Sequence, residues 1–282
     1  MSKVAIITDS SPYIPQDLVN DHNIHVIPLL VIWGEDTLKD GVDIVPGEFY
    51  NRLENAEIMP STSQPPVPVF EKAFRELHNQ GYEILAIFIS DKLSGTISSA
   101  TQAKKLIPEA KIEIIDSESI AMALGFQVLA AARAARNGDS LEKCKHIAEK
   151  VREQTGVVFV VDTLEFLHRG GRIGSAKRFL GTMLNMKPVL AIENGEVVPI
   201  AQVRTQRKAL AELVEIIQEH AQGHSKIHLA SLHANNQKIA LNTFEKALKR
   251  VPAIEVVHSE VSPVVGTHAG PGALGIAYWF EE

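Results

Sequence analysis

The segment Ser94-Gly95-Thr96 combines hydroxyl side chains with a glycine at the predicted start of a helix. Free backbone N–H groups and the helix dipole at such a start favour an anion. Ser94 and Thr96 add hydroxyl donors, and Gly95 lets the backbone approach a ligand closely. The segment therefore predicts an anion site, although Ser94 serving only as the N-cap is an equally good interpretation.

Three further groups of residues could take part in binding or catalysis, but their sequence signals are weaker. Thr62 lies in the hydroxyl-rich segment 61–65, which taken alone predicts only a rigid turn. His268 lies in the glycine-rich segment 266–272, which indicates a loop shaped to approach a partner, although a lone loop histidine is more often a surface residue. Arg169 and Arg172 flank paired glycines, for which a solvated helix connection is at least as good an interpretation as binding.

Several enzyme signatures are absent from the sequence. There is no Gly-x-x-x-x-Gly-Lys-Ser/Thr loop and no His-Glu-x-x-His, and Lys92 precedes Ser94 where a nucleophile elbow needs glycine. His220, His224 and His228 are spaced by four, but a glycine after the first should end the helix and leave the last on a strand. We therefore predict neither a metal site nor a cofactor.

The composition is that of an ordinary globular protein, with 282 residues, 45% hydrophobic side chains and a net charge of −6. A mildly acidic chain argues against nucleic acid as a main partner, since phosphate binding needs a basic surface. The single cysteine, Cys144, excludes an intrachain disulfide and lies on an apolar helical stripe, which favours a buried structural thiol. Without a leader, or an apolar run of the ~20 residues that span a bilayer, we expect a cytoplasmic protein with no transmembrane segment.

The elements that must position these groups alternate between short apolar strands and amphipathic helices. In the first half, strands are predicted over 4–8, 24–33, 82–90 and 111–115. Such alternation predicts an α/β unit with a mostly parallel sheet in three layers. The polar segments that follow its strands should share the rim at the strands' carboxyl ends, where such sheets bind ligands.

The second half begins near residue 157 with another apolar strand. Asn194-Gly195 between two β-branched runs predicts a hairpin, and hence an antiparallel pair within a mixed sheet. We therefore predict two α/β domains, a mostly parallel one over 1–155 and a mixed-sheet one over 156–282.

Five motifs occur in an order that resembles the DegV family. They are Ile-Thr-Asp-Ser-Ser, Thr-Ser-Gln-Pro, Ser-x-x-Leu-Ser-Gly-Thr, Phe-Leu-x-Arg-Gly-Gly-Arg-Ile and His-x-Gly-Pro-Gly, which stand at Ile7–Ser11, Thr62–Pro65, Ser90–Thr96, Phe166–Ile173 and His268–Gly272. The resemblance implies a DegV domain over 3–280, built as a two-domain α/β fold. It further implies a bound long-chain fatty acid, such as palmitate, between the two domains.

The resemblance also implies which residues meet the fatty acid. In the family, the carboxylate is held by hydroxyls that correspond to Thr62 and Ser94, with the loop of His268 nearby. Gly95 and Thr96, which complete the Ser-Gly-Thr segment, are expected at the same site.

Some members of the family are the acyl-carrying subunit of a bacterial fatty acid kinase. A separate ATP-binding subunit phosphorylates the bound carboxylate, and the acyl phosphate enters phospholipid synthesis. The resemblance therefore implies a lipid-binding protein that is not itself an enzyme. It also implies a kinase subunit as partner, and it is compatible with transient contact with a membrane. Arg169, Arg172, Arg204 and Arg207 are the expected partner contacts.

An esterase or acyltransferase is the alternative. It would use Ser94 as nucleophile and His268 as base, with Asp9 or Asp116 orienting the imidazole and an oxyanion site beside them. A kinase acting alone is disfavoured, because the sequence has no nucleotide-phosphate loop.

Overall fold

The computed structural model describes residues 3–179 and 186–282. Its first sheet is four-stranded and wholly parallel, in the order β2-β1-β6-β7. The strands are β1 (Lys3–Asp9), β2 (His25–Ile27), β6 (Tyr82–Phe88) and β7 (Ile112–Asp116). Most residues of the two central strands, β1 and β6, are buried on both faces, as expected of a parallel sheet that helices cover on both sides.

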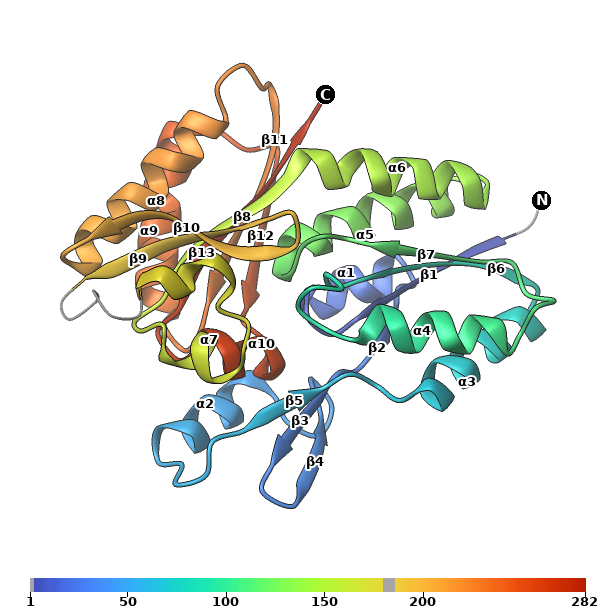
Figure 1. The fold of residues 1–282 in the computed structure, drawn as a ribbon. Helices are drawn as coiled ribbons and strands as arrows, with labels where there is room; N and C mark the ends of the chain where they lie inside the picture. The colour runs from blue at the N-terminus through green and yellow to red at the C-terminus, as the bar shows by residue number, and fades with distance from the viewer. Residues whose placement is uncertain (1–2, 180–185) are drawn as a thin grey trace.

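Helices cover both faces of this sheet and make three layers. Figure 1 shows α3 (Val67–Asn79) and α4 (Thr96–Lys105) below the sheet, and α5 (Ala121–Arg136) and α6 (Leu141–Gln154) above it. Neighbouring residues of β1 therefore enter different cores, with Ile7 packed towards α3 and Ile6 towards α5. The short α1 (Gln16–Asp21) connects β1 to β2. The predicted three-layer α/β class is confirmed.

The second sheet is mixed, as predicted, in the order β10-β9-β8-β13-β11-β12. Only the pair β11–β12 is parallel. The strands are β8 (Thr155–Val160), β9 (Lys187–Glu193), β10 (Glu196–Val203), β11 (Lys226–His233), β12 (Glu255–Glu260) and β13 (Leu274–Glu281). The predicted hairpin at Asn194-Gly195 joins β9 to β10.

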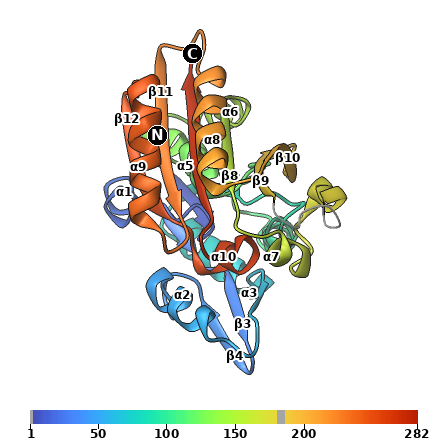
Figure 2. The same cartoon turned by 90° about the vertical axis from the view of Figure 1, so that its left-hand side faces the viewer.

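The helices α8 (Gln206–His220) and α9 (Gln237–Arg250) lie side by side over one face of the second sheet (Figure 2). The other face looks towards α5, which is buried along nearly its whole length because it packs between the two sheets. Because the second sheet begins at Thr155, we keep the division into 1–155 and 156–282 as a proposal.

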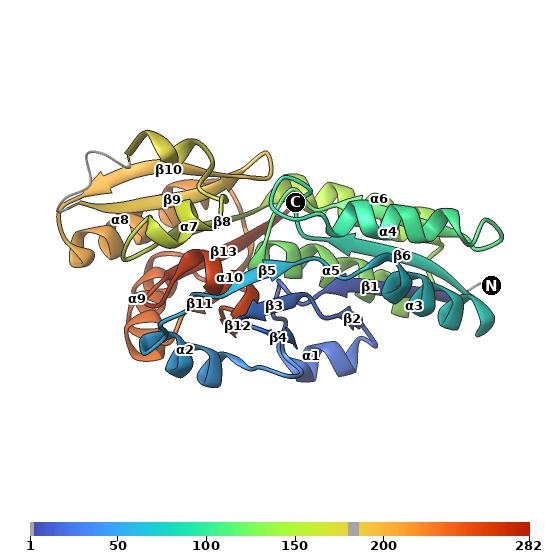
Figure 3. The same cartoon turned by 60° about the horizontal axis from the view of Figure 1, so that its bottom comes forward.

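A small antiparallel sheet, which the sequence did not predict, lies below the two large ones. It contains β3 (Leu30–Trp33), β4 (Asp36–Lys39) and β5 (Ser61–Ser63), with α2 (Pro46–Glu54) beside it. The single strand predicted over 24–33 is therefore wrong: it divides around Pro28, which has no N–H to donate to a sheet. Figure 3 shows β5 next to α10 (Pro263–Ala269), a helix from the other end of the chain.

A charged cluster ties α5 to the second sheet. Both terminal guanidinium nitrogens of Arg133, Nη1 and Nη2, donate to Glu255, and His228 Nδ1 lies 2.6 Å from Oε2 of the same carboxylate. The His228 ring stacks on Trp279, with 4.0 Å between ring centroids. Burial acts to raise the pKa of Glu255, but the hydrogen bonds from His228 and Arg133 outweigh it and hold the pKa at about 2.

Glu255→Gln tests this cluster through acid unfolding. A carboxyl whose pKa falls from 4.5 to about 2 on folding stabilises the protein above pH 4.5, and that contribution disappears as the pH falls towards 2. The variant should therefore lose about 1–3 kcal/mol of unfolding free energy at pH 7, and progressively less between pH 4.5 and 2. Urea unfolding at a series of pH values measures this difference.

The exposed pair Lys150–Glu282 supplies the control for that experiment. Glu282→Gln should change the unfolding free energy by less than about 0.5 kcal/mol at any pH. A difference between parent and Glu255→Gln that stays constant from pH 7 to 2.5 would contradict the assignment.

Candidate functional site

An apolar cavity lies where the two large sheets and the small sheet meet. The space between its lining atoms, together with the open solvent at its mouth, amounts to about 950 Å³. Most of its walls are aliphatic or aromatic and come from both halves of the chain, among them Ile89, Val157, Phe159, Ile192, Leu232 and Leu274. A cavity with such walls holds a hydrocarbon better than a polar ligand.

Polar side chains gather at one part of the cavity lining. Thr62 of β5, Ser94 of the loop after β6, and His268 of α10 all contribute to it, together with Arg172. Thr62 Oγ1 lies 2.7 Å from His268 Nε2. Three of the predicted site residues, distant in sequence, are thus brought to the same cavity.

Gly95 and Thr96 stand behind this lining instead of in it. Thr96 is fully buried, and its Oγ1 lies 2.8 Å from Ser94 Oγ, which orients the Ser94 hydroxyl. A Cβ on Gly95 would lie 3.1 Å from the side chain of Gln64, so the glycine leaves room for a cavity-lining residue that the sequence analysis did not select. The N-cap of α4 is Gly95, and the interpretation of Ser94 as the cap is wrong.

His268 lies in a helix, and the prediction of a glycine-rich loop is wrong. Ser262 caps α10 by accepting from Val265 N, and Gly270, with φ of +78°, ends the helix just after His268. A side chain on Gly170 would collide with Nδ1 of the imidazole. Gly170, the first of the two glycines between Arg169 and Arg172, therefore lets the ring pack closely, a role that no sequence signal indicated.

The imidazole of His268 is neutral at pH 7. Burial, helped by the positive charge of Arg172, lowers its pKa to about 4. Its Nδ1 has no hydrogen-bond partner among residues 3–179 and 186–282. Arg172 is itself fixed at the site, because Nε donates to Leu93 O at 3.0 Å and Nη1 donates to Gly170 O at 2.6 Å.

A groove on the surface borders the polar side of the cavity. Thr62, Arg172 and His268 line both hollows, so they form the partition between the apolar interior and the groove. Arg169 lines the groove and pairs with Glu165. The other predicted contacts, Arg204 and Arg207, are exposed around the start of α8 and line neither hollow.

The residues of the alternative hydrolase do not assemble a triad. His268 Nε2 is bonded to Thr62 and Ser94 to Thr96, so no hydrogen bond joins serine to imidazole. Asp9 accepts from the backbone N–H groups of Ser11 and Ile89, so each of its carboxylate oxygens has a backbone partner and none is bonded to His268. Asp116 likewise accepts from the N–H groups of Glu118 and Asp91.

Within the described residues, no three His, Cys, Asp or Glu side chains cluster in a way that would hold a metal ion. In the same part of the chain, no helix combines the length and apolarity needed to cross a bilayer.

The fold and the site define a class of protein: an α/β protein with two large sheets and one small one, which encloses an apolar cavity with polar side chains in its lining. The chain matches the DegV family, described as "Uncharacterised protein, DegV family", over residues 3–281, and it belongs to that family. It is 34% identical to Protein DegV of Bacillus subtilis (strain 168) over 279 residues, which cover 99% of each chain.

Solved structures of DegV proteins share the whole fold. A DegV family protein from Thermus thermophilus, described by its fatty acid binding, has a TM-score of 0.94 at 32% identity, with 99% of this chain and 100% of that one covered. DegV from Bacillus subtilis, described as a fatty acid binding protein, has a TM-score of 0.91 at 34% identity and full coverage of both chains.

The pKa of His268 can be measured directly. Without ligand, its ring resonances should titrate well below pH 6.5, near the pKa of about 4 that burial and Arg172 impose. Arg172→Gln should raise that pKa, because it removes a positive charge next to the ring. An NMR titration, with His268→Gln to assign the signal, measures both effects.

Arg52→Gln serves as the control, because Arg52 lies on α2 and pairs with Asp36, outside the cavity lining. It should leave the His268 titration unchanged. A His268 that titrates near 6.5 in the parent protein would contradict the described environment.

Proposed function

We propose that this protein binds one long-chain fatty acid, with the acyl tail in the apolar cavity and the carboxylate at Thr62, Ser94 and His268. The observation that carries the proposal is the cavity itself, whose apolar walls end at a group of uncharged hydrogen-bonding side chains. The relatives from Thermus thermophilus and Bacillus subtilis, described as binding fatty acids, support it.

The tail should supply most of the affinity. Each buried CH₂ contributes roughly 0.8 kcal/mol, so a tail of about sixteen carbons gains on the order of 10 kcal/mol before the costs of binding. Hydrogen bonds to the carboxylate add about 1.5–3 kcal/mol each and fix which end of the ligand faces the groove. The two contributions together explain an affinity for fatty acids that needs no buried ion pair.

One tautomer of the neutral imidazole leaves the Thr62 hydroxyl free to donate to the carboxylate. When His268 Nε2 carries the proton, it donates to Thr62 Oγ1 across 2.7 Å, and the Thr62 hydroxyl hydrogen is then free for the carboxylate. Ser94 supplies a second hydroxyl, and the first backbone N–H groups of α4 lie just behind it.

We further propose that a separate ATP-binding kinase subunit phosphorylates the bound carboxylate in the cytoplasm. The groove beside Thr62 and His268 gives such a partner access to the carboxylate from the surface. A carboxylate oxygen would attack the terminal phosphorus of ATP, and ADP would leave, to give an acyl phosphate for phospholipid synthesis. Arg172 and Arg169 line this approach and offer positive charge to phosphate groups.

Protein purified from a bacterial expression host should carry a fatty acid of about fourteen to eighteen carbons. Ser94→Ala should weaken palmitate binding by about 1.5–3 kcal/mol, because one charge-assisted hydrogen bond is lost. Mass spectrometry of the extracted ligand and titration with palmitate measure the two effects.

Ser98→Ala is the matched control, because Ser98 is an exposed serine of α4, the helix that follows Ser94. It should bind palmitate as the parent does. Protein that is always empty and takes up no palmitate would contradict the proposal, and labelling of Ser94 by a fluorophosphonate probe would support the hydrolase instead.

The four arginines separate ligand binding from partner contact. Alanine variants of Arg169, Arg204 and Arg207 should bind palmitate normally but form less acyl phosphate with an added kinase subunit and ATP. A variant that leaves both measurements unchanged removes its arginine from the contact surface. Arg172→Ala should reduce acyl phosphate formation most, because Arg172 also lines the cavity.

A further inference from the structure

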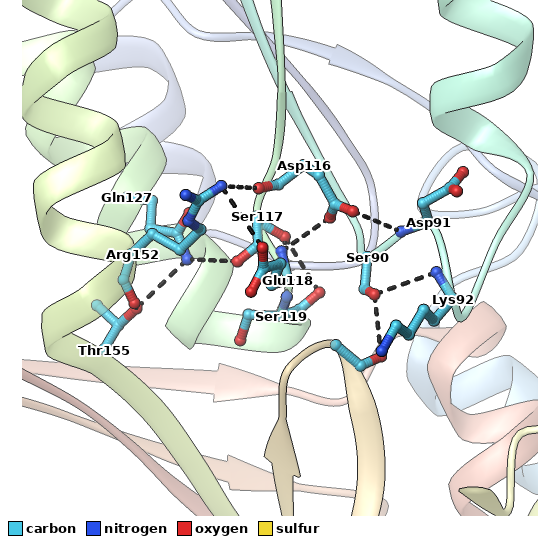
Figure 4. A network of polar contacts seen from close by, with 11 residues as sticks. Ser90, Asp91, Lys92, Asp116, Ser117, Glu118, Ser119, Gln127, Arg152 and Thr155 are labelled. Carbon is cyan, nitrogen blue, oxygen red and sulfur yellow. Dashed lines mark hydrogen bonds and ion pairs between the residues drawn. The ribbon is translucent and has the colours of Figure 1, made fainter.

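The hairpin of β9 and β10 forms part of the cavity wall and reaches the other half of the molecule with its tip. Ile192 and Val197 are paired across the hairpin, and both line the cavity. Gly195, at the tip, is hydrogen-bonded to Ser90 of the loop between β6 and α4. The same loop carries Ser94. Figure 4 shows the turn of a hairpin directly beside Ser90.

Two contacts hold the tip in place. Ser90 Oγ, which is fully buried, donates to Gly195 O at 2.9 Å. Lys92 Nζ lies 3.2 Å from Glu196 Oε1, and about half of each of these side chains is exposed. The carbonyl of Ser90 meanwhile accepts from the N–H group of Ser94 at 3.1 Å, so one residue anchors both the hairpin and the carboxylate donor.

The loop that receives the tip is rigidly supported. Asp116 accepts from the N–H groups of Asp91 and Glu118, and Arg152 donates to the Asp116 carbonyl (Figure 4). Ser90 N also donates to Ser119 O. These hydrogen bonds therefore hold in place the loop that the hairpin tip contacts.

The other parts of the cavity wall are held more firmly than the hairpin tip. The Thr62–His268 hydrogen bond crosses the side facing the groove, and Arg172 bridges Leu93 O and Gly170 O beside it. The strands β8, β11 and β13 are each paired on both sides within the sheet, and β9 is likewise paired with β8 as far as Ala191, which leaves only the end of the hairpin unpaired on that side. The strand β10 is the edge of that sheet, and its pairing is shifted between Pro199 and Ala201.

On the basis of the proposed fatty-acid binding, we propose that the β9–β10 hairpin is a flap that opens to let the acyl chain enter and leave. The hydrogen bond from Ser90 holds this flap closed. Lifting the tip beyond Ala191, the last residue of β9 that pairs with β8, breaks the Ser90–Gly195 hydrogen bond and the Lys92–Glu196 ion pair. It also separates Val197 from the backbone of Gly174 and removes Ile192 and Val197 from the cavity wall. Ser90 is thereby a positioning residue that couples release of the tail to the placement of Ser94.

A reversible crosslink tests the flap. A Cβ on Gly195 would lie 3.4 Å from the Cβ of Ser90, close to the range of about 3.5–4.5 Å in disulfides. The variant Ser90→Cys/Gly195→Cys is loaded with palmitate in its reduced form, and half of the sample is then oxidised. Exchange of the bound acid for deuterated palmitate is followed by mass spectrometry, and the buried Cys144 is kept.

The oxidised protein should exchange its ligand at least about tenfold more slowly than the reduced protein, and reduction should restore the rate. Because both forms carry the same substitutions, strain at Gly195, whose φ is +81°, affects them alike. Equal exchange rates in loaded protein would overturn the flap while leaving fatty-acid binding intact. Protein that never takes up palmitate would overturn both proposals.

A charge reversal gives a second measurement that needs no cysteine. Lys92→Glu places like charges at the tip and should speed palmitate exchange several-fold, whereas Lys92→Glu/Glu196→Lys should return it towards the parent rate. The control Lys111→Glu alters the pair that exposed Lys111 makes with the mostly buried Glu83 of β6, in the first sheet and not in the sheet of the hairpin, and should leave exchange unchanged. Exchange that is the same in the parent, Lys92→Glu and double variants would overturn the flap.

Discussion

The hydrogen bond between Thr62 and His268 is the contact on which the geometry of the site depends. It joins residues 206 positions apart, so several separate structures must be in place before it can form. The strand β5 must pair with β3, which sets Thr62 opposite Val31. The helix α10 must pack beside it, which requires glycine at Gly170 to admit the imidazole. The small sheet contributes Val31 and Trp33 to the core, and its pairing of β5 with β3 also holds Thr62 in position.

The site uses neutral donors at the end of an apolar cavity, and this choice has a physical reason. A free ammonium or guanidinium enclosed among aliphatic side chains would lose its hydration, a cost that an incoming carboxylate repays only in part. Hydroxyls and a neutral imidazole lose far less when the cavity is empty. The one guanidinium that lines the cavity in the described chain, Arg172, has two backbone carbonyls as partners and also faces the groove.

Local patterns predicted the elements well, and the failures lie where distant segments decide the outcome. The hairpin at Asn194-Gly195 follows from turn chemistry alone and is where it was expected. The segment around Pro28 read as one strand because its apolar run is continuous, yet its two parts pair with different neighbours. His268 was assigned to a loop because glycines surround it, but those glycines admit Tyr50 and Phe166 against a helix end. The order of the motifs predicted Thr62 and Ser94 as site residues, whereas no local signal could reveal which apolar residues face the cavity.

The position of β13 sets when the cavity can close during folding. This strand is the last of the described elements in sequence, yet it lies between β8 and β11 in the middle of its sheet. Leu274 and Gly275 of the same strand also line the cavity. The second sheet and the cavity therefore cannot be completed until β13 has paired with two strands that are far from it in sequence. Such long-range pairing is slower to form than a local hairpin such as β9–β10, so closure of the cavity belongs to the late steps of folding.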